Sequence, residues 1–396
     1  MKILMATAYD YPHIGGLSTH VSTLKAGLES RGHEVDVLSF SNTSPMIRKL
    51  YAQGPSFVLN KIKKGRGIIW SHYARKKCLV QLLEKVSLNH YDIINAQDPM
   101  ATLAVLDTDM PVVSTVHGYM AFEAISKGIV VEGSPEANEL QELEIKAYQG
   151  TREIITVDQR LKNYVNKISG VEATSVGNFI DIHNFKPDKS KKNDLRKQYG
   201  IAEDELVLFV PRRMIQKNGV IYPTLALPAV LEKYPKAHLI YAGGGNQVTE
   251  IKRIITEKGL ENNITLLGEV PHEKVKDYYA LADIVIVPSV HSAGVEEATS
   301  ISALEAMGSG TPLIACAVGG LMEIVNPGVD GVLIEEKNVE QMSEAIIDFL
   351  DHPEKGMEMA QRAREKIEKE YSHLAAAEKY EEVYMLALNQ REKQLV

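Results

Sequence analysis

The sequence has little cysteine and no long hydrophobic run, and these two absences exclude several classes of protein. Cys78 and Cys316 are its only cysteines, too few for a disulfide framework. No uninterrupted apolar run approaches the roughly 18 residues that a membrane span needs, and the N-terminal residues do not have the layout of a signal peptide. We therefore expect a cytoplasmic protein without a membrane-spanning segment.

Acidic residues are missing from one long stretch, although they outnumber basic residues overall. The net charge of −8 argues against wholesale nucleic-acid binding. Between Asp36 and Glu84, however, there is no acid, and basic residues are interleaved there with apolar ones. This pattern fits the solvated face of a helix, peripheral contact with the inner membrane surface, or binding of a phosphorylated acceptor. The basic residues of this stretch, 48–77, are Arg48, Lys49, Lys61, Lys63, Lys64, Arg66, Arg75, Lys76 and Lys77.

The length of 396 residues is too great for one typical hydrophobic core, so two domains are expected. Short apolar segments alternate with helical patterns, which is typical of α/β domains with a parallel, doubly wound sheet. The alternation pauses over the polar, basic segment 184–194, which indicates a linker, and then restarts. The expected strands are 2–8, 34–40, 92–96, 112–116, 153–157, 206–210, 238–242, 264–267, 284–287 and 313–315.

A helical pattern covers everything after about residue 337. It ends in a long amphipathic helix with one apolar side, formed by Leu374, Ala377, Tyr380, Tyr384 and Leu388. Two doubly wound domains place the carboxyl ends of their strands around a cleft, which is the expected ligand site.

Several candidate residues follow the expected strands directly. Gly15 and Gly16 come between the first strand and a helix, where the backbone can approach a phosphate, although a tight turn explains them equally well. His117 ends strand 112–116, where an imidazole can donate to a sugar hydroxyl or carry a proton. Arg212 and Lys217 follow strand 206–210 and could hold a diphosphate, although each could also be an ordinary surface charge. His20 is a weaker candidate.

The most informative run contains Glu297 and Glu305, which are too far apart to be neighbours on one helical turn. A single ligand can contact both glutamates only if Glu297 lies in a loop and Glu305 lies at the start of a helix. Ser302 and Glu305 have the spacing of a capping box, which predicts that helix start, but a capping role also competes with ligand binding by Glu305. The glycine run 243–245 follows another strand and could approach a nucleotide.

A D-x-D sequence, Asp107-Thr108-Asp109, invites a metal-binding interpretation. It lies between a helical segment and the start of strand 112–116, at the amino edge of the expected sheet. We interpret it as a loop, because ligands of such sheets bind at the opposite edge.

Together these segments resemble the retaining glycosyltransferases of family 4, which have the two-domain GT-B fold. The resemblance runs over essentially the whole chain. It also includes Gly268, the segment 178–187 with Asn178, Asp181 and Pro187, and the segment 319–323, which begins with two glycines. It implies an N-terminal acceptor-binding domain, 1–185, joined by the C-terminal helix 373–396, and a donor-binding domain, 186–372.

The resemblance also implies roles for individual residues. The catalytic group comprises His117 near the reacting carbon, Arg212 and Lys217 on the donor diphosphate, and Glu297 on the sugar hydroxyls. Glu305 would bind the ribose, and His20 would lie on the acceptor side. Further donor-binding positions are Gly15, Gly16, Gly244, Gly268, Val270, Thr299, Ser300, Ile301 and Ser302.

The expected reaction is transfer of a hexose-type sugar from a nucleoside-diphosphate sugar, such as UDP-GlcNAc or UDP-Glc, to a small-molecule or lipid-linked acceptor. Neither a metal nor another cofactor is expected. The family's usual Glu-Gly-Phe-Gly is replaced by Glu297-Ala298-Thr299-Ser300, which leaves the sugar open. The alternatives are a non-catalytic nucleotide-sugar-binding or scaffold protein and a GT-B epimerase.

Overall fold

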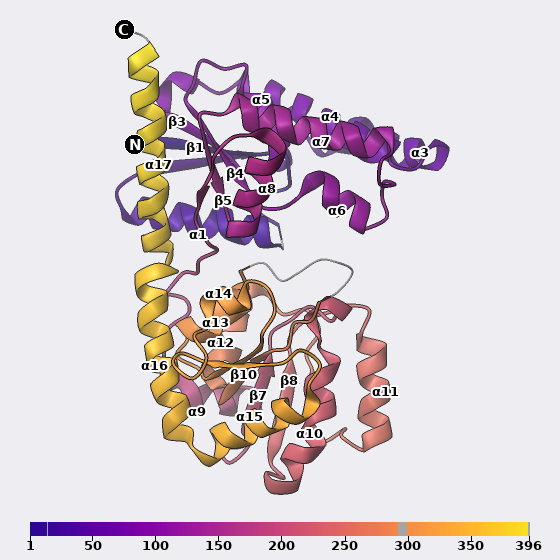
Figure 1. Cartoon of the computed structure of the whole chain (residues 1–396), viewed down its shortest axis with the longest axis vertical. Helices are drawn as coiled ribbons and strands as arrows, with labels where there is room; N and C mark the ends of the chain where they lie inside the picture. The colour runs from indigo at the N-terminus through magenta and orange to yellow at the C-terminus, as the bar shows by residue number, and fades with distance from the viewer. Residues whose placement is uncertain (14, 292–298, 395–396) are drawn as a thin grey trace. The chain divides into compact units, whose positions relative to one another are not determined.

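The computed structural model describes residues 1–13, 15–291 and 299–394, and these form two compact units. The first unit consists of Met1–Gly177 with His373–Val396, and the second of Asn178–Ser372. Each unit is built on a parallel six-stranded sheet with helices on both faces (Figure 1). The predicted fold class, two doubly wound α/β domains, is therefore confirmed.

The sheet of the first unit has the order β2-β1-β3-β4-β5-β6. Its winding reverses between β1 and β3, because β1 pairs with both β2 and β3. Such a reversal leaves a crevice at the carboxyl ends of the two strands. The strands are β1 Lys2–Thr7, β2 Glu34–Ser39, β3 Ile93–Ala96, β4 Val112–Val116, β5 Glu153–Thr156 and β6 Thr174–Ser175.

Helix α17, His373–Gln394, belongs to the first unit although it follows the whole second unit in the sequence. It packs on α1 and against β4 and β5 (Figure 1). Of the predicted apolar side, Ala377, Tyr380 and Tyr384 are fully buried, whereas Leu374 and Leu388 are only partly buried. Gly27 of α1 permits this packing, because a Cβ there would overlap the backbone of His373. The other helices of this unit are α1 Gly16–Ser30, α2 Pro45–Ile47, α3 Gly54–Ile62, α4 Arg66–Leu83, α5 Pro99–Val105, α6 Met120–Ser126, α7 Pro135–Gly150 and α8 Gln159–Ser169.

The sheet of the second unit has the order β12-β11-β10-β7-β8-β9, and its winding reverses between β7 and β10. Alternate residues of β7 contribute to two hydrophobic cores, with Leu208 and Val210 in one and Val207 and Phe209 in the other. Both faces of the sheet are therefore covered, as in other parallel sheets. Its strands are β7 Leu206–Val210, β8 Ala237–Tyr241, β9 Ile264–Leu266, β10 Ile284–Val287, β11 Leu313–Cys316 and β12 Val332–Ile334.

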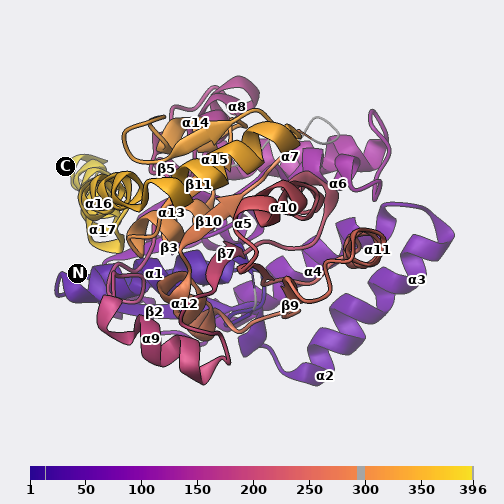
Figure 2. The same cartoon turned by 90° about the horizontal axis from the view of Figure 1, so that it is seen from below.

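The helices of the second unit follow its strands in regular alternation, and Figure 2 shows them from below. They are α9 Lys189–Gln198, α10 Ile221–Lys233, α11 Val248–Lys258, α12 His272–Leu281, α13 Ile301–Gly308, α14 Leu321–Ile324, α15 Val339–Asp351 and α16 Pro353–Glu370.

Two details of the predicted organisation need correction. The polar segment 184–194 is not a linker throughout, because α9 begins inside it, and Arg196 of this helix is buried and donates to the carboxylate of Asp283 at 2.7 Å. The units divide at Gly177 and Asn178 rather than at residue 185. The reason is packing, since Ile180 and Phe185 lie in a core of the second unit.

Candidate active site

The carboxyl ends of β7 and β10 carry most of the predicted donor-binding residues of the second unit. Arg212 and Lys217 follow β7, and Ser300 to Glu305 follow β10. These two strands are the neighbours between which the winding of the sheet reverses. Parallel sheets bind ligands at this position, because loops from strands wound in opposite directions diverge there. The topology thus brings these predicted residues to one edge of one sheet.

Arg212 connects three segments of this edge. It is 8% exposed, and its guanidinium donates to Ser300 Oγ at 3.1 Å, to Asn218 Oδ1 at 2.8 Å and to Ser289 Oγ at 3.0 Å. These acceptors belong to the α13 start, the β7 loop and the β10 loop. The planar guanidinium presents several donors in a fixed arrangement, so one side chain can hold three segments in register.

Lys217 lies in a short 3-10 turn, Gln216–Asn218, and its side chain is partly exposed. Among the described residues, none accepts a hydrogen bond from its ammonium group or forms an ion pair with it. Its backbone is fixed, since Val290 N donates to Lys217 O at 2.9 Å. Gly219 follows with φ 60°, and a Cβ there would overlap Pro288 O, so only glycine allows this approach.

Glu305 is buried on the inward side of α13, with 5% of its surface exposed. Tyr279 OH donates to its carboxylate at 2.7 Å and lies 3.2 Å from Ser302 O. Burial, followed by the negative charge of Glu305, raises the pKa of Tyr279 well above its usual value, so the phenol stays a donor. The ring therefore holds the carboxylate in one orientation.

The predicted capping box of Ser302 and Glu305 is wrong. Helix α13 begins at Ile301 with Ser300 as its N-cap residue, so Ser302 is already inside the first turn. Ser302 Oγ donates instead to Pro211 O at 2.9 Å. The first backbone N–H groups of a helix have no acceptor within the helix. In α13 these are the N–H groups of Ile301 and Ser302, which follow the buried residues Thr299 and Ser300.

Two glycines of the run 243–245 are required by packing against the backbone of the β7 loop. Gly243 has φ 148° and Gly245 φ 152°, and Cβ atoms there would overlap Arg212 O and Met214 O. Gly244 O also accepts from Met214 N at 2.8 Å. The next loop joins this arrangement through Gly268 O, which accepts from Gly243 N at 2.7 Å, while Val270 packs against a core of the unit.

Two predicted site residues remain that lie between β10 and α13 in the sequence, Glu297 and Thr299. Glu297, with its neighbour Ala298, lies outside the described residues. Thr299 is buried, and its carbonyl oxygen accepts from Asn178 Nδ2 at 3.1 Å.

In the first unit, α1 begins at Gly16 with Gly15 as its N-cap residue. No side chain caps this end, and there is no acidic residue in the first turn. A Cβ on Gly16 would meet nothing within 4 Å. The start of α1 is therefore an uncapped helix N-terminus, whose amide groups and dipole favour an anion.

His117 follows β4 as a partly buried residue and contacts a chain of fully buried polar side chains. Its Nε2 lies 3.0 Å from Gln97 Oε1, while the Gln97 amide nitrogen donates to Asn95 Oδ1. Tyr384 OH of α17 donates to the same Asn95 oxygen at 3.1 Å, and Asn95 Nδ2 donates to Thr115 Oγ1 at 3.0 Å. Because Gln97 Oε1 can only accept, His117 carries its proton on Nε2 and keeps Nδ1 as an acceptor.

His20 joins the same cluster from α1. It is buried, its Nε2 lies 3.1 Å from Tyr380 OH, and its ring meets that of His117 edge to face with centroids 4.5 Å apart. The structure thus brings His20 and His117 together, with α17 behind them. Burial lowers the pKa of His117 to about 4, so this ring is neutral at physiological pH.

Asp107 and Asp109 lie between α5 and β4, at the amino end of that strand, where the sequence placed them. Among the residues that the structure describes, no three histidines, cysteines or acidic residues gather as a metal site would require.

The sequence did not indicate four residues that support the site. Gln97 accepts from His117, Asn95 accepts from Gln97, Asn218 accepts from Arg212, and Tyr279 donates to Glu305. One signal was present. Asn95 and Gln97 are polar residues at the end of an otherwise apolar strand, and both are fully buried. Tyr279 gave no signal, because its partner is distant in the sequence.

The fold and this arrangement of loops define a class, the GT-B glycosyltransferases. Sucrose-phosphate synthase of Thermosynechococcus elongatus is similar in structure, with a TM-score of 0.72 and 20% identity over 98% of this chain and 99% of that one. HepE of Anabaena, crystallised with UDP and glucose, gives a TM-score of 0.67 and 20% identity over 96% and 98%. At these identities the likeness shows the fold.

The sequence identifies the family. The model described as Glycosyltransferase Family 4 matches residues 14–184, and that of Glycosyl transferases group 1 matches residues 191–366. An uncharacterized glycosyltransferase of Methanocaldococcus jannaschii is 28% identical over 403 residues, 98% of this chain and 99% of that protein. The chain therefore belongs to the group 1 glycosyltransferases of family 4, which confirms the predicted family and enzyme class.

The state of His117 can be measured directly. We expect a neutral ring with the proton on Nε2 down to about pH 4, because burial disfavours the charged form and Gln97 accepts from Nε2. Nitrogen-15 NMR of labelled protein reports both the tautomer and the titration. Gln97→Leu should give a mixture of tautomers, whereas Gln149→Leu, which removes a bond to Ser169 O far from this cluster in sequence, should not. A predominant Nδ1–H form in the parent protein would contradict the assignment.

Proposed function

We propose that this glycosyltransferase moves a hexose-type sugar from a UDP-sugar to an acceptor with retention of anomeric configuration. The observation that carries the proposal is the convergence of Arg212, Lys217, Glu305 and the first turn of α13 where the winding of the second unit's sheet reverses. This combination suits a nucleoside diphosphate, because it joins two cations and helix amides for phosphates to a carboxylate for ribose hydroxyls.

The second unit would bind the donor. Lys217 and Arg212 stabilise the negative charge that develops on the departing diphosphate, and the amides of Ile301 and Ser302 add donors along the same direction. Glu305, oriented by Tyr279, accepts from the ribose hydroxyls. Gly268 and Val270 would border the base, and Glu297 would hold the sugar hydroxyls. UDP is favoured because HepE, which shares the fold, was crystallised with UDP and glucose.

The first unit would supply the acceptor and the groups near the reacting carbon. The uncapped start of α1 at Gly16 suits a phosphate of the donor. Nδ1 of neutral His117 can accept a hydrogen bond from a sugar hydroxyl, while His20 keeps the ring in place. Retention is explained by attack of the acceptor from the side on which the diphosphate leaves, with that phosphate accepting the acceptor's proton. The two carboxylates therefore do not act as a glycosidase pair.

Neither metal nor organic cofactor is required in this scheme, since Arg212 and Lys217 take the place of a divalent cation beside the diphosphate. The acceptor is a small molecule or a lipid-linked one, and a lipid-linked acceptor would bring the enzyme to a membrane surface. Among the described helices, none combines the length and apolar character needed to span a membrane. We infer a cytoplasmic protein, in which Cys78 and Cys316 stay reduced and buried.

A panel of UDP-, GDP- and ADP-sugars tests the donor and the metal together. We expect slow hydrolysis of one UDP-sugar without acceptor and equal rates with and without EDTA, because protein cations stabilise the leaving group. Released nucleotide is measured by coupled assay, and the best donor is then offered to soluble and lipid-linked acceptors. Loss of activity in EDTA, restored by Mn²⁺, would refute the metal-independent scheme and return attention to Asp107 and Asp109.

Lys217→Ala should reduce kcat by about 100-fold or more, because it removes a charge that acts mainly in the transition state. Its fold should survive, since the bond from Val290 N reaches the backbone oxygen of residue 217. Arg213→Ala is the matched control, a cation on the same loop with an exposed side chain. Similar rates for both variants would show that Lys217 contributes only to general surface charge.

Glu305→Ala should weaken UDP binding by about 1–3 kcal/mol, because the ribose loses hydrogen bonds to a buried carboxylate. Calorimetric titration with UDP measures this. Tyr279→Phe removes the supporting hydroxyl but keeps the carboxylate, so it should weaken binding much less. Equal losses in the two variants would mean that Glu305 acts through packing of α13 and not through the nucleotide.

A further inference from the structure

The helix α3 of the first unit buries none of its residues, although several are large and apolar. Phe57 is 64% exposed, Val58 55% and Ile62 76%. Leu50, in the preceding turn Arg48–Gln53, is 67% exposed, and Met46 of α2 is 69% exposed. Exposed apolar residues are common singly, but a cluster in one short segment indicates an interaction surface. We call Met46, Leu50, Phe57, Val58, Lys61 and Ile62 the α3 face.

Polar and backbone contacts attach α3 to α4, which explains how its apolar side chains stay outside. Ser56 Oγ donates to Gly67 O at 2.7 Å, and Gly67 N donates to Asn60 Oδ1 at 2.9 Å. A Cβ on Gly67 would overlap Ser56 O, so the helices approach at backbone distance there. Both Figure 1 and Figure 2 show α3 at the periphery of the first unit, away from its sheet. Position and attachment thus leave the α3 face directed away from the core.

The segment that carries the α3 face contributes charge of one sign, because it lacks acidic residues. Four of its cations form ion pairs with three acids from elsewhere in the unit: Arg48 and Arg75 with Asp10, Lys63 with Glu136, and Arg66 with Glu139. Lys49, Lys61 and Lys64 form no ion pair with any described residue. Lys61 lies over the ring of Phe57, with Nζ 4.5 Å from its centroid. Apolar side chains and unpaired cations therefore occur together.

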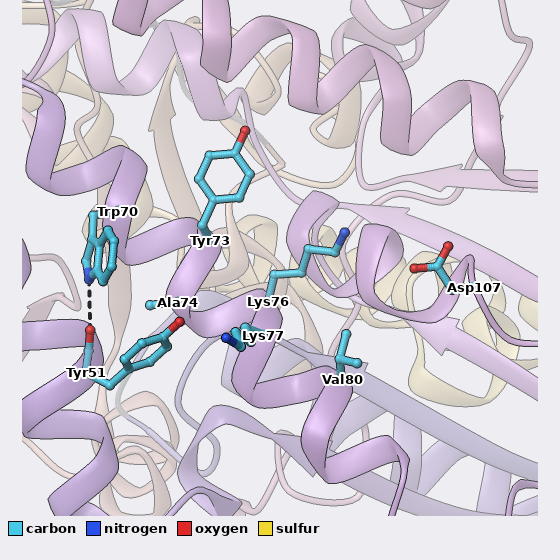
Figure 3. Close-up of a pocket in the computed structure, with 8 residues that line it drawn as sticks. All are labelled: Tyr51, Trp70, Tyr73, Ala74, Lys76, Lys77, Val80 and Asp107. Carbon is cyan, nitrogen blue, oxygen red and sulfur yellow. Dashed lines mark hydrogen bonds between the residues drawn. The ribbon is translucent and has the colours of Figure 1, made fainter.

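Two hollows adjoin this face. One, of about 630 Å³, is lined by Lys49, Leu50, Val58 and Trp70 among others. The second, of about 340 Å³, is lined by Trp70, Lys76, Lys77 and Asp107 among others (Figure 3). Trp70 thus lines both hollows, and its indole N–H donates to Tyr51 O at 2.8 Å. An apolar hollow edged by lysine suits an acyl chain beneath an anionic headgroup.

We propose that the α3 face binds the surface of an anionic lipid bilayer, with its apolar side chains in the headgroup–acyl boundary and its lysines on the headgroups. This inference rests on the proposed function and deepens it. It gives the unit proposed to bind the acceptor a membrane as its partner. A bilayer fits better than a second copy of this chain. A twofold interface through this face would place lysines opposite lysines, and like charges oppose such contacts.

Sedimentation with vesicles tests the proposal without any substrate. The full-length protein should bind vesicles of phosphatidylcholine with 30% phosphatidylglycerol, and bind pure phosphatidylcholine at least tenfold more weakly. Phe57→Ser with Ile62→Ser should reduce binding by roughly tenfold or more, because both side chains leave the boundary region. Lys61→Gln with Lys64→Gln should reduce it by roughly fivefold per lysine near the surface.

The control is Met357→Ser, which removes an apolar side chain of the second unit that is 49% exposed and should not change binding. Circular dichroism melts check that each variant is folded. Absence of binding to anionic vesicles, or equal loss in the control, would overturn the proposal. A concentration-dependent dimer that Phe57→Ser with Ile62→Ser abolishes would assign the face to self-association instead. Because no sugar donor is present, failure here leaves the proposed transferase activity untouched, and the reverse also holds.

Discussion

The loops at the carboxyl edge of the second unit's sheet depend on the hydrogen bonds of one buried guanidinium, that of Arg212. It contacts the loop after β7, the loop after β10 and the start of α13, three segments that the sequence separates widely. A buried cation must be satisfied by oriented acceptors, so moving one of these segments would expose or orphan a charge. Glycine adds a second constraint of the same kind, because Gly219 and Gly243 bring neighbouring loops into backbone contact. The geometry of these loops is therefore set by contacts within the protein itself.

In the first unit, the corresponding contacts keep the imidazole of His117 neutral, with its proton on Nε2. Gln97 accepts from His117, Asn95 orients Gln97, and Tyr384 of α17 donates to Asn95. Each member has a partner, as a buried polar network requires. The hydrogen-bond chain that orients His117 consequently extends from the end of β4 to α17, a helix that lies far away in the sequence.

Hydrophobic periodicity predicted most of the fold, because strands buried on both faces form short apolar runs that are easy to recognise. The strands β6 and β12 escaped because they span only two and three residues, and the start of α9 escaped because it lies in a polar, basic segment. Residues directly after strands, such as His117 and Arg212, were found because topology alone carries them to one edge of a sheet. Their partners were not, because Tyr279 and Asn218 are recognisable only through contacts. The capping box failed for a related reason: spacing cannot show that Ser302 prefers Pro211 O.

The membership of α17 in the first unit has a consequence for biosynthesis. Residues 178–372 form a continuous unit and can fold as soon as they have left the ribosome. The first unit cannot, because Tyr380 and Tyr384 fill its interior only after α17 has been translated. The unit that begins the chain is thus the later one to be completed, and until then His20 lacks its contact with Tyr380 and Asn95 lacks its contact with Tyr384. The nascent protein can thus contain a completed second unit while the side chains around His117 are still incompletely packed.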